Sequence, residues 1–335
     1  TLALRAAGAE PAWAVGAAVA QLGANAGQGA GEYAVVEADE SDGSFVAFAP
    51  SVLVLTNFEA DHLDFHGTEE NLRAVLSAFA ARLKETNGTL VACADDLGAL
   101  AFARDAREAG IRVVTYGEHP DASWRITADH SSAAGAHVEV ESPNGERVNL
   151  SLRVPGRHNV LNALGVLAAL EVLDIERGGV LAGLAEFAGA DRRFQIAGEV
   201  RGLAVIDDYA HHPREVAAAL AAGRERAEGG KLVAVFQPHL FSRTKAFARE
   251  FAEALSVADE TILLPIYPAR EDFDPSIRSE DVASLIDGAR VLEPHDVPGY
   301  LASHAHDARV ILMMGAGDIV DVSPRILEAL EARGA

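Results

Sequence analysis

Apolar and polar positions alternate in blocks along the first half of the chain. Two short apolar runs, residues 33–36 and 52–55, each end in a polar, acidic cluster. Continuous apolar runs of this length, bounded by turn signals, predict adjacent parallel strands that are fully buried. Ligands of open parallel sheets bind beyond the carboxyl ends of the strands. The clusters at 37–42 and 56–64 therefore predict a site for a hard cation, most simply Mg²⁺ with its phosphates.

The pattern further along the chain predicts an α/β fold whose first domain is residues 1–190. Apolar residues at helical spacing predict a helix at 72–83, and further helices are predicted at 96–109, 158–173 and 176–188. Short apolar runs predict strands at 90–93 and 111–114, and alternating segments predict antiparallel strands at 124–127, 137–140 and 148–154, with Asn144-Gly145 as a hairpin turn. We expect a central, mostly parallel sheet with a small antiparallel extension.

A short polar segment at 189–193 predicts the boundary to a second domain, residues 191–335. Beyond it, helical segments separate five candidate strands, at 203–206, 232–236, 261–264, 290–292 and 310–313. This alternation predicts another open parallel sheet, Rossmann-like in its arrangement. Each strand is followed by polar residues, at 207–213, 237–245, 267–271, 293–296 and 315–318. One edge of this sheet is therefore expected to gather acids, histidines and arginines.

Composition narrows the class of partner. The chain has 335 residues, 49% of them hydrophobic, and a net charge of −22, which makes a nucleic-acid backbone an unfavourable partner. One cysteine, Cys93, excludes an internal disulfide and fits a reducing compartment such as the cytoplasm. Arg5, Glu10 and Pro11 interrupt the alanine-rich start, so we expect no signal peptide. No stretch of the sequence is long and apolar enough to predict a membrane span. Because the chain begins with Thr1, we expect that it was cut from a longer protein.

The polar residues at the first two strand ends differ in how strongly they indicate a functional role. Glu37 and His62 lie at or just after predicted buried strand ends, where an unpaired ionisable group is costly, so we favour a functional role. The neighbouring acids are equally well explained as solvated loop residues, helix-start acids or caps.

A pair of asparagines begins the predicted helix at 158–173. Asn159 and Asn162 are three residues apart and therefore share one helix face. Carboxamides offer the paired donors and acceptors that recognition of an adenine edge requires. The alternative is that Asn159 only caps the helix, which would leave Asn162 unexplained.

Two further interpretations of the second domain are weaker. The adjacent His211 and His212, with nearby acids and His239, could bind a transition metal, but no HExxH or paired-cysteine spacing supports this. The segment 315–317 (Gly-Ala-Gly) lacks the third glycine of a dinucleotide fingerprint, which argues against a dinucleotide oxidoreductase. A tight turn close to a ligand is the simpler interpretation.

Taken together, seven motifs resemble those of the Mur ligase family, and they follow the family's order along nearly the whole chain. One motif would be weak evidence, whereas seven in order are specific. They are Glu-Ala-Asp-Glu-Ser-Asp (37–42), Thr-Asn-Phe-Glu-Ala-Asp-His-Leu-Asp (56–64), Gly-Arg-His-Asn-Val-Leu-Asn (156–162), Arg-Arg-Phe (192–194), Asp-Asp-Tyr-Ala-His-His-Pro (207–213), Gln-Pro-His-Leu-Phe-Ser-Arg-Thr (237–244) and Gly-Ala-Gly-Asp (315–318).

The resemblance implies an ATP-dependent ligase that forms an amide bond. In this family the γ-phosphoryl group of ATP passes to a substrate carboxylate, and an incoming amine attacks the acyl phosphate. The motifs are most similar to those of the branch that joins L-alanine to UDP-N-acetylmuramate. The demands on the protein are then positioning and charge neutralisation more than covalent catalysis.

The resemblance also implies roles for individual residues. Glu37 and His62 would bind Mg²⁺, and Asn159 and Asn162 would contact adenine. Arg193 would face the phosphates as a catalytic residue. The remaining implied residues would shape the nucleotide–sugar and alanine side of the site, with catalytic roles for the two histidines and the arginine: Asp208, Tyr209, His211, His239 and Arg243.

The chain departs from the family pattern at its start. The family's UDP-holding domain and its Gly-rich phosphate loop ending in Lys-Thr are absent from the printed residues, and residues 1–9 resemble part of the helix that follows this loop. We therefore expect the chain by itself to be nearly inactive. Two alternatives stay open, a sister ligase that attaches a recycled murein peptide to UDP-N-acetylmuramate and a non-catalytic nucleotide-binding fragment.

Overall fold

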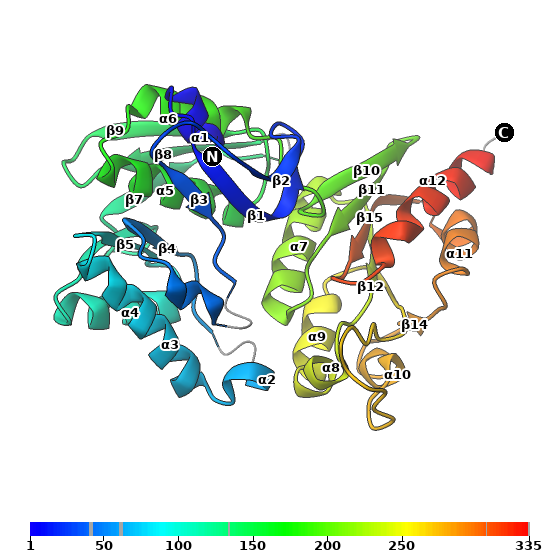
Figure 1. The fold of residues 1–335 in the computed structure, drawn as a ribbon. Helices are drawn as coiled ribbons and strands as arrows, with labels where there is room; N and C mark the ends of the chain where they lie inside the picture. Colours follow the sequence, from blue (N-terminus) through cyan, green and yellow to red (C-terminus); the bar gives the residue numbers. More distant parts are fainter. Residues whose placement is uncertain (40–42, 60–62, 133–134, 306, 334–335) are drawn as a thin grey trace. The chain divides into compact units, whose positions relative to one another are not determined.

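The computed structural model of the chain describes residues 1–39, 43–59, 63–132, 135–305 and 307–333. By its internal contacts the chain divides into two compact units, Thr1–Ala188 and Gly189–Ala335. Each unit has its own sheets and helices (Figure 1).

A mostly parallel sheet forms the centre of the first unit. Within the described ranges its strands follow the order β4 (Val52–Leu55), β5 (Thr89–Cys93), β6 (Arg112–Gly117), β7 (Trp124–Asp129), β8 (Ala136–Glu141) and β9 (Arg147–Leu152). Neighbours from β4 to β7 are parallel, whereas β8 is antiparallel to both β7 and β9. The predicted parallel sheet with an antiparallel extension is confirmed.

A smaller sheet in the same unit corrects the expectation for the two opening strands. Its order among the described residues is β2 (Ala24–Gly27), β1 (Ala12–Val19) and β3 (Ala34–Val36). The run at 33–36 therefore pairs with β1, whereas the run at 52–55 pairs with β5. The two strands are not hydrogen-bonded neighbours, and they are not fully buried, since Val36 is 43% and Val54 39% exposed. An apolar run indicates a strand, but burial depends on the elements that cover it.

Helices cover both faces of the parallel part of the larger sheet. Along β5, Leu90 and Ala92 pack with α3 (Glu69–Ala81) and α4 (Leu97–Glu108), whereas Val91 and Cys93 pack with α5 (Arg157–Val172). Successive strand residues point to opposite faces, which explains the continuous apolar run at 90–93. The unit also contains α1 (Leu2–Ala6), α2 (Leu63–His66), α6 (Arg177–Glu186), and the 3₁₀ turns η1 (Ser44–Ala47) and η2 (Arg82–Lys84).

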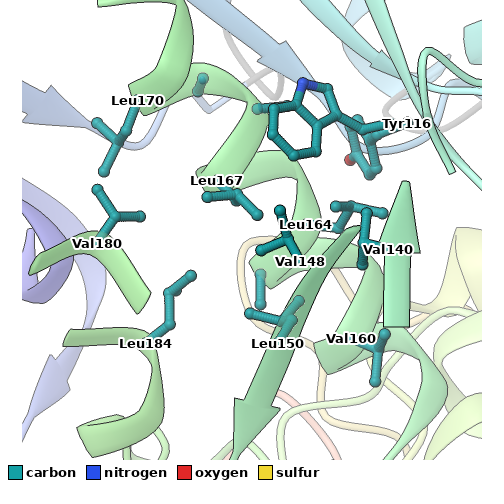
Figure 2. Close-up of a cluster of buried hydrophobic side chains, with 14 of the residues drawn as sticks. Tyr116, Val140, Val148, Leu150, Val160, Leu164, Leu167, Leu170, Val180 and Leu184 are labelled. Carbon is teal, nitrogen blue, oxygen red and sulfur yellow. The ribbon is translucent and has the colours of Figure 1, made fainter. Parts of the chain in front are cut away.

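One apolar stripe fixes the orientation of α5. Val160, Leu164 and Leu167 recur at helical spacing, and none is more than 1% exposed. Figure 2 shows them in one cluster with Val140 of β8 and Val148 of β9. Most of α5 from Val160 to Leu170 is buried, so its accessible residues lie mainly in its first turns.

The second unit contains a single sheet among its described residues. The strand order is β10 (Gln195–Val200), β11 (Leu203–Asp208), β15 (Ala308–Met314), β12 (Lys231–Phe236), β13 (Glu260–Leu263) and β14 (Arg290–Val291). Every neighbouring pair is parallel except β10 with β11. The predicted Rossmann-like sheet is confirmed, and β10 is an additional antiparallel edge strand.

Both faces of this sheet are covered. Along β12, Leu232, Ala234 and Phe236 pack with α7 (Pro213–Arg226), α9 (Ala248–Leu255) and α10 (Ser279–Ala283), whereas Val233 and Val235 pack with α11 (Val297–His304), η3 (Ile319–Val322) and α12 (Ser323–Ala332). Helix α8 (Phe241–Ala246) follows β12. Across the described helices of the chain, none combines the length and apolar character needed to cross a membrane.

Replacing Leu164 of α5 with alanine is expected to lower the free energy of unfolding of the first unit by about 2–5 kcal/mol, because it opens a cavity in the core. Leu164 is 0% exposed. Both tryptophans, Trp13 and Trp124, lie in this unit, so tryptophan fluorescence during urea titration reports its unfolding.

The matched control is Leu97→Ala, because Leu97 is 81% exposed. We expect it to change the free energy of unfolding by less than about 0.5 kcal/mol. Equal losses in the two variants would contradict the assignment of the α5 stripe to the core.

Candidate functional site

Glu37 follows β3 directly and lies against β1. The backbone N–H of Gly16 donates to Glu37 Oε2 at 2.6 Å, and the Glu37 backbone N–H donates to Ala14 O at 2.9 Å. A Cβ at position 16 would stand 3.2 Å from this oxygen, so a larger residue there would crowd the carboxylate. The side chain is exposed, which corrects the expectation of a buried strand end. A carboxylate held by backbone but open to solvent has the right chemistry for Mg²⁺.

The second predicted Mg²⁺ ligand, His62, lies outside the described residues, so the pair itself stays a prediction. Elsewhere in the described ranges, no three His, Cys, Asp or Glu residues gather as a metal-binding group. Mg²⁺ commonly uses one or two protein carboxylates with phosphates and water, so such a group is not required. A transition metal at His211 and His212 would need one, and the interpretation loses support.

The asparagine pair lies at the start of α5. Gly156 is the N-cap with a φ of +100°, and Asn159 Nδ2 donates to Pro155 O at 2.7 Å. Asn159 is therefore not the N-cap, although its side chain does stabilise the chain entry into the helix. Asn162, two positions beyond the buried Val160, is exposed. Its carboxamide is accessible to a ligand at the helix start.

Two acids that the sequence analysis did not single out hold the surroundings of this helix start. Asp95 and Asp96 directly follow β5 and Ala94. Asp95 accepts hydrogen bonds from the β6–β7 turn and from Arg157 of α5. Asp96 caps α4 by accepting from the Ala99 N–H at 2.8 Å, and it also accepts from Phe58 N–H at 3.1 Å. Their strand-end position is the same signal that identified Glu37.

In the second unit, backbone register places the polar strand ends side by side. Asp208 of β11 and Phe236 of β12 are both level with Met314 of β15. The residues that follow these positions therefore leave the sheet at one edge. The register therefore brings the polar segments that follow β11, β12 and β15 to one edge, as the sequence predicted.

The two acids that end β11 are anchored differently. Asp207 is 6% exposed and accepts from Ser323 Oγ at 2.5 Å. Asp208 accepts from the backbone N–H groups of Phe194 and Ala210, both at 2.8 Å. Burial raises the pKa of both carboxyl groups, and hydrogen bonds to the ionised form oppose this shift. Asp208 thus holds the backbone at Phe194 and at Ala210.

Arg192 and Arg193 both lie near Tyr209 but contact different partners. Arg192 Nη2 donates to the carbonyl oxygens of Gly315 and Gly317, each at 2.9 Å. The guanidinium of Arg192 lies 4.7 Å and that of Arg193 lies 5.3 Å from the Tyr209 ring centroid, within cation–π range. Arg193 is exposed, with Nη1 4.0 Å from Glu215 Oε1. Arg192 is therefore a structural clamp, and Arg193 is accessible to an anionic ligand.

Two rings, those of Tyr267 and His211, lie close to the His239 ring. The His239 ring stacks with Tyr267 at 5.7 Å between centroids and lies 5.9 Å from the His211 ring. Burial lowers the pKa of His239 to about 4, and the charges of His211, Arg243 and Arg270 add to this. His239 is therefore neutral at pH 7, beside cationic side chains.

His211 is oriented by acceptors on one side of its ring. Its Nδ1 lies 2.9 Å from Tyr209 O and 3.3 Å from Glu215 Oε2. Both oxygens accept hydrogen bonds, so Nδ1 carries a proton, and in the neutral ring Nε2 is the basic nitrogen.

The chain belongs to the Mur ligase family. Residues 17–170 match the Mur ligase middle domain, and residues 192–324 match the family described as Mur ligase, glutamate ligase domain. Members of this family are ATP-dependent ligases that form amide bonds. The family that the seven motifs indicated is confirmed.

Individual relatives point to one branch of the family. The UDP-N-acetylmuramate–L-alanine ligase of Renibacterium salmoninarum is 46% identical over 332 residues, which are 98% of this chain and 70% of the relative. The enzyme of the same name from Thermobifida fusca is 42% identical over 341 residues, covering 98% of this chain and 72% of the relative. This chain thus spans about 70% of the length of these relatives.

Solved structures agree with this fold. The UDP-N-acetylmuramate-alanine ligase MurC from Thermotoga maritima matches with a TM-score of 0.78 and 30% identity, covering 99% of this chain and 71% of that chain. A murein peptide ligase from Psychrobacter arcticus matches with a TM-score of 0.67 and 21% identity, covering 98% and 73%. The second likeness shows a shared fold alone.

The ring of His239 is expected to titrate with a pKa of about 4, well below its ordinary value of 6.5. Because the folded pKa is the lower one, protons favour the unfolded state. The free energy of unfolding should therefore fall as the pH drops from 6.5 to about 4, and this contribution should be complete above 6.5. NMR titration of the histidine rings measures the pKa directly.

The matched variant Arg270→Gln removes one of the cations that lower this pKa. We expect the His239 pKa to rise in this variant and the fold to persist. A wild-type His239 that titrates near 6.5 would contradict the buried, cation-flanked environment.

Proposed function

We propose that this chain provides the ATP-binding and C-terminal parts of a ligase that joins L-alanine to UDP-N-acetylmuramate in peptidoglycan synthesis, with Mg²⁺ as the metal. The observation that carries the proposal is the 42–46% identity, along 98% of the chain, to ligases named for this reaction. The strand-end residues of both units support it.

In the first unit, we assign nucleotide binding to the start of α5 and to the end of β3. The exposed carboxamide of Asn162, with Asn159, would hold the adenine edge. Glu37, with His62, would hold Mg²⁺. Bound ATP would supply the γ-phosphoryl group that activates the substrate carboxylate, and Mg²⁺ would screen the phosphate charge.

In the second unit, we assign anion binding to arginines and proton transfer to a histidine. Arg193 is exposed and suits a phosphate, and Arg243 beside the neutral His239 suits a carboxylate. Tyr209 lies under the guanidinium of Arg193, and Asp208 holds the backbone of the next residue, Phe194. The basic Nε2 of His211 would accept a proton from the ammonium group of alanine, which frees the amine for attack.

Adenine-nucleotide titration tests the proposed nucleotide site. By calorimetry we expect Mg²⁺-dependent ADP binding with a Kd on the order of 1 mM or tighter, and no competition by GDP, because the carboxamides read the adenine edge. The double variant Asn159→Ala, Asn162→Ala should bind at least about tenfold more weakly. The control Asn149→Ala removes an exposed carboxamide from β9 of the same unit and should bind normally. Absence of Mg²⁺-dependent binding to the wild-type chain would favour a bare scaffold.

Ligation itself is expected to be slow with the 335 residues alone. These residues contain no Gly-rich turn ending in Lys-Thr, the element that holds the ATP phosphates in the family. Phosphate release should be at least about a hundredfold below that of a complete ligase, as expected when a main phosphate contact is missing. Rapid release that requires both UDP-N-acetylmuramate and L-alanine would contradict this expectation. Preferential use of a murein tripeptide in place of L-alanine would favour the sister ligase.

A further inference from the structure

The end of β5 provides a rigid reference point in the first unit. All five residues of this strand are buried, and β5 pairs with both β4 and β6. Asp95 lies two residues beyond the strand, and its side chain is 21% exposed. A carboxylate so close to a fully buried strand has little freedom to move.

Three donors from two other segments meet at the Asp95 carboxylate. The backbone N–H groups of Glu118 and His119 donate to Oδ1 at 2.7 and 2.8 Å. Arg157 Nη2 donates to Oδ2 at 2.9 Å and also lies 3.0 Å from Glu118 Oε2. Charge-assisted hydrogen bonds of this kind are stronger than neutral ones. Asp95 thus ties the β6–β7 turn and the first residue of α5 to the end of β5.

The backbone is shaped to admit this carboxylate. Gly117 has a φ of +142°, which L side chains rarely adopt, and a Cβ there would stand 2.3 Å from Asp95 Oδ1. A side chain at position 117 would therefore displace Asp95 from the turn. The contact is built into the backbone of three segments and does not depend on a surface ion pair alone.

We propose that Asp95 is a positioning residue for the nucleotide site, acting through Arg157 on the start of α5. The inference rests on the proposed function, because Asn159 lies two residues beyond Arg157. The buried part of α5 begins at Val160, so residues 157–159 precede it and need a separate anchor. The Asp95–Arg157 contact supplies that anchor and so fixes where the carboxamides meet a ligand.

The test compares Asp95→Asn with Asp121→Asn in the 335-residue chain. Asparagine keeps the shape of Asp95 and can still accept from the turn, but it loses the charge that holds Arg157. Asp121 is the matched control, because it lies in the same turn and pairs with Arg104 at 2.7 Å on the exposed surface. The control therefore removes a similar ion pair that does not reach α5.

Two readouts separate positioning from general stability. In hydrogen exchange without nucleotide, Asp95→Asn should speed exchange in a peptide spanning 156–163 about tenfold, and Asp121→Asn should not. In ADP titration with Mg²⁺, Asp95→Asn should raise the Kd about tenfold, while urea unfolding followed by tryptophan fluorescence still shows a folded unit. Arg157→Met should raise the Kd by a similar factor, and the double variant should add little, because both changes break one contact.

The outcomes are distinguishable. If Asp95→Asn and Arg157→Met both bind ADP within twofold of the wild type, the positioning role is wrong and the nucleotide site stands. If the wild-type chain does not bind ADP, the proposed function fails, and unchanged exchange at 156–163 in Asp95→Asn would overturn the anchor as well. Should Asp95→Asn not fold, Arg157→Met alone carries the test, with Arg104→Met as its control.

Discussion

Burial of the central parallel strands on both faces is the constraint on which both candidate sites depend. In β5 and β12, successive residues enter opposite cores, so neither strand can slip by one residue without exchanging its two faces. The hydrogen-bond register then fixes where each strand ends. In the second unit, β11, β12 and β15 end at the same level, at Asp208, Phe236 and Met314. The motifs that follow these strands therefore lie at one edge of the sheet. The loops carry the chemistry, and the buried strands provide its position.

The charge of the whole chain is a poor guide to the chemistry of its sites. The net charge is −22, yet arginines and a histidine with a lowered pKa mark the carboxyl edge of the second sheet. A few cations in a partly buried setting can bind an anion locally even when the surface as a whole is acidic. The arginines there are also not equivalent. Arg192 is occupied by two backbone carbonyl groups, so Arg193 is the better candidate for a ligand phosphate.

Much of the fold could be predicted because apolar runs and helix boundaries are signals that a short stretch of sequence carries. The helix α3 and the strands β5, β11, β12 and β15 follow from their apolar patterns, and α5 and α6 follow from helix start and stop signals. The strands β1 and β2 were not predicted, because they consist largely of alanine and glycine, which have low strand propensity. The error at β3 and β4 has a different origin. A short apolar run is enough to predict a strand. Which strand it pairs with, and which helices cover it, depend on tertiary structure that the runs at 33–36 and 52–55 do not specify.

Most residues of the candidate site were expected because they follow predicted strands, whereas Asn159 and Asn162 were expected at a helix start. Glu37, Asp208 and His239 were expected in the site because they end or follow predicted strands. Asp95 carries the same signal, and it was overlooked because its importance comes from partners 23 to 62 residues away in the chain. Long-range hydrogen bonds of this kind have no local pattern. The tasks of Arg192 and Arg193 were likewise separated by the fold, since adjacent residues in a turn point to different partners.

Three strained backbone positions lie near the edge of the second sheet. Arg192, Phe194 and Leu240 have positive φ values of 60°, 49° and 68°, a conformation that costs a non-glycine residue about 1–3 kcal/mol. Each lies within or beside a motif, and each is held by its surroundings. Tyr209 N–H donates to Arg192 O at 2.7 Å, Phe194 N–H donates to Asp208, and Leu240 N–H donates to Tyr267 O at 2.9 Å. Other described non-glycine residues outside the motifs, such as Arg201 and Glu228, also have positive φ values, so this conformation by itself does not mark a site. At these three turns the hydrogen bonds to Tyr209, Asp208 and Tyr267 hold the backbone that carries Arg193, His239 and Arg243.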